Sequence, residues 1–167
     1  TGLNAAQAHL ATAGHNIVHP EAGPVASMTI QPALDGSSHF EPTEIGGYVI
    51  PPEWRRGFAA RHDYGCILLK NAAIGHQLGW FGMARYDAPP QNLLAQVCGY
   101  PAARRPQTQY YHGGRLGAWT DDFLHYIFAT SPGVSGAPVF ATFGGDRLVI
   151  GVHHWGAGPS NRGIRLS

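Results

Sequence analysis

Residues 131–155, SPGVSGAPVFATFGGDRLVIGVHHW, contain the pattern that decides the expected fold. Two short apolar segments, 137–143 and 147–155, are separated by the glycine-rich residues 144–146, and this arrangement predicts a β-hairpin. The glycine pair at 113–114 predicts another turn of this kind. Short apolar segments separated by turn residues recur along the chain, for example at 65–70, 95–100 and 124–130. This spacing favours an all-β sandwich or barrel over a helical fold.

The composition limits the classes of function. With 167 residues, 44% of them apolar, the chain can bury a core as one domain or two small subdomains. Only 13% of the residues are charged and the net charge is +1, so no basic face suggests nucleic acid. There is no apolar run of about 18 residues that could span a membrane, and no retained signal peptide. We therefore expect function to come from a site, without nucleic acid or membrane partners.

Helical patterns are brief, at residues 15–19 and 52–57. Residues 84–95, ARYDAPPQNLLA, interrupt the strand rhythm with a double proline, and we interpret them as the connection between two β-subdomains. The expected organisation is an N-terminal β-barrel subdomain at 1–83 and a C-terminal one at 96–167. A site could then lie in the cleft beside the connection.

Cysteine and histidine usage does not predict a metal site. Cys66 and Cys98 stand in apolar segments, which is typical of buried strand positions. The ten histidines include two closely spaced pairs, His15 with His19 and His153 with His154. No cysteine or carboxylate at ligand spacing completes a zinc shell around either pair. We expect no metal and no cofactor, and a histidine-rich metal-binding β-domain is the alternative with least support.

Ser135 stands in the glycine-flanked sequence GVSG, which would expose its hydroxyl and aim backbone N–H groups at a ligand. The same sequence also fits a tight turn. A nucleophilic serine needs a base and a group that orients the base. His15, at the end of a small-residue strand, is the candidate base. Asp63 is the candidate orienting group, because a carboxylate beside the apolar strand that follows it must be paired. The order His, Asp, Ser is one known order of the catalytic triad.

Four segments carry a resemblance to a known family: TAGH at 12–15, DYGCILL at 63–69, GVSGAPVF at 133–140 and VIGVHHWG at 149–156. In this order they resemble a trypsin-like serine endopeptidase of the chymotrypsin fold, in the glutamyl endopeptidase branch that includes staphylococcal V8 protease and fungal relatives. The resemblance implies two antiparallel six-stranded β-barrels with the active site in the cleft between them. It also places the two cysteines in different barrels, which favours free thiols over a bridge.

The resemblance implies roles for individual residues. His15 would be the general base, Asp63 its orienting group and Ser135 the nucleophile, while the N–H groups of Gly133 and Ser135 would form the oxyanion hole. In glutamyl endopeptidases a threonine and a histidine bind the substrate carboxylate. Thr130 matches this threonine, and His153 matches the histidine, with His154 as the fallback. Trp155 and Gly156, on the same strand, would also be substrate-binding residues. Because neighbours on a strand point to opposite faces, only one of the two histidines can serve.

We therefore expect a secreted serine endopeptidase that cleaves protein or peptide substrates after Glu, and less well after Asp. Val134 stands where trypsin-like zymogens use an aspartate, so activation through that ion pair is not expected. Both ends of the chain look short for the family, and we expect a monomer that further terminal segments complete. The alternative is an inactive protease-like module that binds acidic peptides. The complete set of His15, Asp63 and Ser135 argues against it, since the loss of one member suffices for inactivity.

Overall fold

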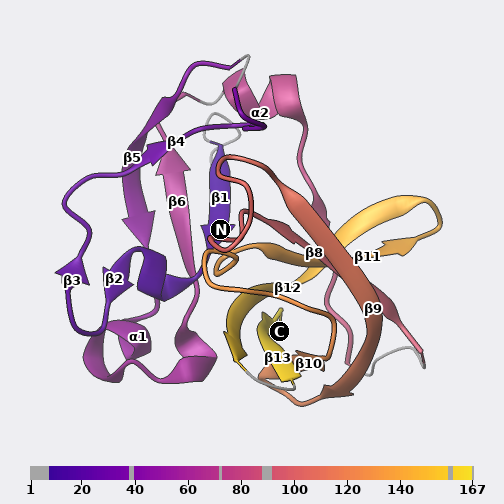
Figure 1. Ribbon diagram of the computed structural model, residues 1–167. Helices are drawn as coiled ribbons and strands as arrows, with labels where there is room; N and C mark the ends of the chain where they lie inside the picture. Colours follow the sequence, from indigo (N-terminus) through magenta and orange to yellow (C-terminus); the bar gives the residue numbers. More distant parts are fainter. Residues whose placement is uncertain (1–7, 38–39, 72, 88–91, 158–159, 167) are drawn as a thin grey trace.

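The computed structural model describes residues 8–37, 40–71, 73–87, 92–157 and 160–166, and strands make up most of its regular secondary structure (Figure 1). The helices are short: α1 at Pro52–Gly57, α2 at Ala73–Leu78, and 3₁₀ turns at Gly14–Asn16 and Ala60–His62. The all-β prediction is confirmed, and helical structure occurs at both of the expected places. Helix α2 was not expected from the sequence.

The N-terminal half, drawn in indigo to magenta in Figure 1, forms an antiparallel four-stranded sheet. Its order is β1 (His9–Thr12), β6 (Gly65–Leu69), β5 (Thr43–Val49) and β4 (Thr29–Ile30). A separate hairpin pairs β2 (Val18–His19) with β3 (Gly23–Pro24). Alternate residues of β6 are buried, and Ile67 and Leu69 pack in one core with Ile17 and Trp54. This half is therefore a half-barrel sheet over its own core.

The C-terminal half forms a closed barrel of six strands. Around the barrel these are β11 (Pro138–Phe143), β8 (Leu94–Gly99), β9 (Tyr110–Trp119), β10 (Phe123–Tyr126), β13 (Ser160–Arg165) and β12 (Asp146–Ala157), and β12 pairs back with β11. The short strand β7 (Gly82–Met83) adds to β12 in parallel. The chymotrypsin-like architecture is confirmed in this form, as one closed barrel and one half-barrel sheet. The division at residues 84–95 stays a prediction, because residues 88–91 lie outside the described residues.

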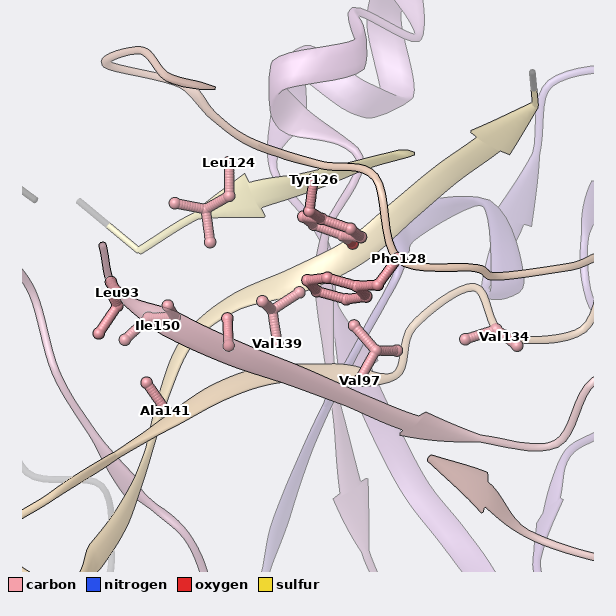
Figure 2. Packing of buried hydrophobic residues seen from close by; sticks show 10 residues of the cluster. Leu93, Val97, Leu124, Tyr126, Phe128, Val134, Val139, Ala141 and Ile150 are labelled. Carbon is pink, nitrogen blue, oxygen red and sulfur yellow. The ribbon is translucent and has the colours of Figure 1, made fainter. Parts of the chain in front are cut away.

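Aromatic and branched side chains fill the C-terminal barrel (Figure 2). The rings of Tyr126 and Phe128 stack with their centroids 4.4 Å apart and an angle of 10° between their planes. Leu124 and Val139, from β10 and β11, are completely buried in the same cluster. The strands that carry the candidate site are thus anchored in a packed core.

Two of the predicted turns have different outcomes. Gly144 and Gly145 connect β11 to β12 with positive φ angles of 59° and 98°, as a two-residue hairpin turn requires, so this turn is confirmed. The turn predicted at 113–114 is wrong, because both glycines lie inside β9. A side chain at Gly113 would collide with the backbone of Ala95, so this glycine permits the close approach of β9 to β8.

Cys66 on β6 and Cys98 on β8 are both free thiols, as expected. Burial raises the pKa of each thiol above its ordinary value. Since the thiolate is the reactive form, both cysteines are poor nucleophiles.

Candidate active site

Asp63 is the most constrained residue of the candidate site. It follows the 3₁₀ turn Ala60–His62 just before β6, and only 1% of the residue is exposed. Its Oδ1 accepts the backbone N–H of His15 at 2.7 Å, and its Oδ2 lies 2.6 Å from Nδ1 of His15 and 2.5 Å from Nδ1 of His154. Burial alone would raise the pKa of this carboxyl, but the hydrogen bonds from His15 and His154 outweigh it and hold the pKa at about 2. The carboxylate is therefore ionised and fully paired.

His15 reaches Asp63 because β1 ends in a tight 3₁₀ turn. Gly14, in that turn, is needed for the approach: a Cβ there would lie 3.0 Å from the Trp54 ring and 3.1 Å from Oδ1 of Asp63. The indole N–H of Trp54 donates to the carbonyl of Val18 at 3.0 Å, which fixes the ring behind the turn. With Nδ1 of His15 facing the carboxylate, Nε2 is the nitrogen left for a substrate or a nucleophile. The His15 side chain is 24% exposed, so a ligand can reach it.

The loop at 131–137 places Ser135 against the N-terminal half. The side-chain amide of Asn16 donates to the Ser135 carbonyl at 2.9 Å, and the N–H of Gly136 donates to the carbonyl of His153 at 2.8 Å. Ser135 is thus held beside the turn that carries His15. Among the described residues no hydrogen bond joins the Ser135 hydroxyl to His15, and catalytic contacts of this kind often tighten only when substrate is bound.

The two glycines around Ser135 have specific structural reasons. Gly133 has a φ of +94° and Gly136 a φ of +88°, which side chains rarely adopt. A Cβ on Gly133 would lie 2.7 Å from the carbonyl oxygen of Tyr100, and one on Gly136 would lie 2.7 Å from the amide nitrogen of Asn16. The glycines therefore allow the loop to pack closely against both halves of the molecule.

The backbone amides of Gly133 and Ser135 have no backbone acceptor among the described residues. The neighbouring amides do have partners: Val134 donates to Ser131 and Gly136 donates to His153. Two N–H groups of the serine loop are therefore left without a backbone acceptor. An oxyanion hole needs two such donors.

His153 and His154 contact different partners: His153 contacts Tyr126 and His154 contacts Asp63, and the pairing of β12 with β13 shifts register between His153 and Trp155. His153 is 2% exposed, and its Nδ1 lies 2.5 Å from the hydroxyl of Tyr126, inside the C-terminal barrel. Burial, together with the nearby His154 and His15, lowers the pKa of His153 from 6.5 to about 4. His153 is therefore neutral at pH 7, while His154 faces Asp63.

The remaining predicted pocket residues gather around Asn161 on β13. The hydroxyl of Thr130 donates to Oδ1 of Asn161 at 2.8 Å, and the amide of Asn161 donates to the carbonyl of Phe128 at 2.6 Å. Gly156 lies against both Thr130 and Asn161, so any side chain there would collide with them. Trp155, next to it, is half exposed. Sequence reasoning expected the Thr130 hydroxyl to face a ligand, but it is bonded to Asn161.

Four residues that contact the site were missed as functional: Asn16, Tyr126, Asn161 and Arg162. Asn16 directly follows His15 in the chain, and that position was the one available signal. Tyr126 and Asn161 are separated from their partners by 27 and 31 positions, so strand pattern could not connect them. Arg162 approaches Nε2 of His154 with its guanidinium at 3.4 Å.

The donor atoms of His15, Asp63 and His154 lie within 4.8 Å of one another, as they also would around a metal ion. However, the nitrogens of both histidines are 2.5–2.6 Å from the same carboxylate oxygen. Ligands bonded to a tetrahedral zinc ion at about 2.0–2.1 Å are about 3.3 Å apart. The contacts therefore fit shared protons and do not fit a bridging ion.

The chain is similar in sequence to two curated bacterial proteins. No known family profile matches the chain. It is 31% identical to the glutamyl endopeptidase of Bacillus licheniformis over 95% of its length and 52% of that protein. It is also 26% identical to a protein of Bacillus subtilis named extracellular metalloprotease, over 93% of its length and 50% of that protein. The chain thus spans about half the length of these curated relatives. Both relatives are bacterial, so the expected likeness to fungal members is not supported.

Solved structures show the same fold. A glutamyl endopeptidase in complex with MPD superimposes with a TM-score of 0.83 at 18% identity, covering 94% of this chain and 74% of that one. The protease Anisep of Arthrobacter nicotinovorans gives a TM-score of 0.78 at 17% identity, covering 99% and 80%. A thermostable serine protease, AL20, gives 0.77 at 21% identity with the same coverage. The chain therefore has the chymotrypsin-like protease fold. In sequence it is related to a bacterial glutamyl endopeptidase.

Proposed function

We propose that this chain is a secreted serine endopeptidase that hydrolyses peptide bonds through an acyl-enzyme and prefers Glu, then Asp, before the scissile bond. The observation that carries the proposal is the hydrogen-bonded pair of Asp63 and His15, held beside the glycine-flanked loop of Ser135. The relatedness to a glutamyl endopeptidase supports the reaction class. Secretion is supported by the relative that is named extracellular. Among the described residues, no helix is long and apolar enough to cross a membrane.

The first chemical step follows from the hydrogen bonds of His15. Because Nδ1–H of His15 donates to Asp63, Nε2 carries the lone pair that accepts the Ser135 proton. The Ser135 oxygen then bonds to the substrate carbonyl carbon, and the negative charge moves to the carbonyl oxygen. Asp63 stabilises the imidazolium without taking its proton. The imidazolium next protonates the amine nitrogen as the scissile C–N bond breaks, which leaves the acyl group on Ser135. Water, deprotonated by His15, then attacks the ester carbon, and the Ser135 oxygen leaves and regains its proton from His15.

The two free amides of the serine loop would hold the oxyanion. Gly133 and Ser135 donate to no backbone group in the described structure, so binding a ligand breaks no existing backbone bond there. Preorganised donors of this kind are worth on the order of 10²–10³ in turnover each. The positive φ at Gly133 sets the direction of the loop at this point.

The preference for an acidic side chain rests mainly on His153. When the Tyr126 hydroxyl donates to Nδ1 of His153, the neutral ring carries its proton on Nε2 and can donate it to a carboxylate. Thr130 can add a second donor only by turning its hydroxyl away from Asn161. A bound carboxylate would also favour the protonated form of His153, since an opposite charge stabilises a cation.

Labelling with a fluorophosphonate tests the nucleophile. We expect intact-protein mass spectrometry to show one label on the wild type and none on Ser135→Ala. Ser131→Ala, in the same loop, is the matched control and should keep the label. If the folded wild type fails to react and fails to cleave denatured proteins, but still binds acidic peptides, the inactive binding module is the correct function.

Cleavage-site mapping tests the specificity. Mass spectrometry of peptides from a denatured protein mixture should show cuts after Glu, with fewer after Asp. For matched peptides with Glu or Gln before the cut, His153→Gln should lose at least about 10-fold of the Glu preference, as expected for a lost charge-assisted hydrogen bond. His76→Gln, an exposed histidine on α2, should keep it. Equal cleavage after Gln and Glu by the wild type would contradict the assigned pocket.

A further inference from the structure

A β-bulge places His154 over the catalytic carboxylate. In the pairing of β12 with β13, His153 is opposite Gly163 and Trp155 is opposite Arg162, so His154 is the extra residue between them. Bulges re-aim a side chain without ending a strand, and they are frequent next to active sites. Here the bulge directs the His154 ring out of the barrel and toward Asp63 of the other half.

One carboxylate oxygen of Asp63 receives hydrogen bonds from both His15 and His154. Oδ2 of Asp63 lies 2.6 Å from Nδ1 of His15 and 2.5 Å from Nδ1 of His154, and Oδ1 is bonded to the backbone of His15. Asp63 is almost fully buried, so water cannot replace a lost donor easily. The two ring centroids lie 6.3 Å apart with an angle of 65° between the ring planes, so the rings reach the oxygen from different directions.

Arg162 faces the other nitrogen of the His154 ring. Its Nη2 lies 3.4 Å from Nε2 of His154, and because a guanidinium can only donate, Nε2 is the acceptor in this long contact, which leaves Nδ1 to carry the proton toward Asp63. Arg162 is itself fixed between two rings, 4.6 Å from the centre of Phe123 and 5.6 Å from that of Trp155. The charged or titratable groups around the His154 ring are Asp63, His15, Arg162 and the adjacent His153.

We propose that His154 is a positioning residue for the catalytic carboxylate: oriented by Arg162, it donates Nδ1–H to Asp63 and thereby fixes the aspartate in the geometry that orients His15. Arg162 donates a hydrogen bond to His154, and His154 donates one to Asp63. Asp63 also accepts a hydrogen bond from His15. This inference rests on the proposed protease function. It assigns His154 a role on the aspartate and removes it as a fallback ligand for the substrate carboxylate.

The proposal predicts two separable effects of losing the donor. Asp63 becomes free to rotate, so His15 spends less time in the productive orientation and kcat falls. The full charge of Oδ2 then faces His15 alone, which stabilises its imidazolium and moves the acid limb of the pH profile of kcat/KM to higher pH. The substrate pocket is unchanged, so KM for a Glu peptide stays within about 2-fold.

A pair of substitutions of similar shape separates positioning from packing. His154→Leu removes the donor, and His154→Asn puts an amide nitrogen near the position of Nδ1. We expect kcat to fall at least about 10-fold in the Leu variant, the loss typical of a hydrogen bond to a charged group, with the acid limb shifted. The Asn variant should recover most of the rate and the wild-type limb. If the two variants are equally impaired, or both behave as the wild type, the proposal is wrong.

Imidazole NMR tests the same contact without catalysis. The folded protein should show two strongly downfield N–H protons, on Nδ1 of His15 and of His154, and ¹⁵N shifts should show Nε2 of His154 unprotonated. Ser135→Ala should keep both signals and His154→Leu should lose one. A wild type that shows both signals but neither cleaves peptides nor labels contradicts only the proposed function. A wild type without the His154 signal contradicts the positioning role.

Discussion

Asn16 donates its side-chain amide to the backbone carbonyl of Ser135 at 2.9 Å, and 119 positions separate the two residues in the chain. This bond joins the turn that carries His15 to the loop that carries the candidate nucleophile. The same amide donates to the hydroxyl of Thr12 at 3.1 Å, so its orientation is fixed from the N-terminal side. This amide group therefore contributes directly to the relative placement of base and nucleophile.

Asn16→Leu, which keeps the approximate shape and removes the donor, should lower both stability and the rate of fluorophosphonate labelling. Leaving the Ser135 carbonyl without its donor costs about 1–3 kcal/mol, measurable by urea unfolding. Thr12→Val is the matched control, because it removes the other partner of the amide and leaves the Ser135 contact in place. A labelling rate that falls equally in both variants would count against this bond as the link between base and nucleophile.

Gly136→Ala should destabilise the protein by more than Gly145→Ala. Both glycines have positive φ, at 88° and 98°, so both substitutions carry a conformational cost of about 1–2 kcal/mol. Only Gly136 is crowded, with Ala13 and Asn16 within 3.0 Å of an added Cβ, whereas nothing lies within 4 Å at Gly145. Denaturant midpoints measure the difference, and Gly136→Ala should also lose labelling. Equal midpoints would show that the loop yields to the added methyl group.

Because the pKa of Asp63 is lowered in the folded state, the free energy of unfolding should decrease at low pH. The folded pKa is about 2 and the ordinary value is 3.8, so the folded state binds the proton less well than the unfolded state. The stabilisation is therefore fully present above about pH 4 and is lost as the pH falls through 2, with a size of about 2 kcal/mol. Urea unfolding at pH 2.5 and pH 5 should show this slope in the wild type. Asp63→Asn should lack it.

His153 should produce a second loss of stability at higher pH. Its folded pKa is about 4 against an ordinary 6.5, so the neutral ring is favoured in the folded state. The contribution of His153 to the free energy of unfolding is therefore fully present above about pH 6.5. It decreases by about 3 kcal/mol as the pH drops toward 4. His153→Gln should remove this slope, while His76→Gln should retain it because that side chain is exposed. A slope unchanged in His153→Gln would assign the transition to other groups.

Local pattern was sufficient for some of these features. Alternation of short apolar segments predicted the strands, and the glycines at 144 and 145 predicted the hairpin, because both depend on neighbours in the chain. The same reasoning failed at 113–114, where the glycines serve a close approach between two strands. A turn and a tight strand contact use the same residue type, so only the packed structure distinguishes them.

The sequence by itself determined the β class and the motif order that suggested His15, Asp63 and Ser135, since each follows from residue type and strand pattern. Only the tertiary structure decided which histidine meets the aspartate, that Thr130 is bonded to Asn161, and that Arg162 orients His154. These contacts join segments from different strands, and one of them depends on a bulge. Strand pairing and register, which place such groups within hydrogen-bonding distance, are properties of the folded chain as a whole.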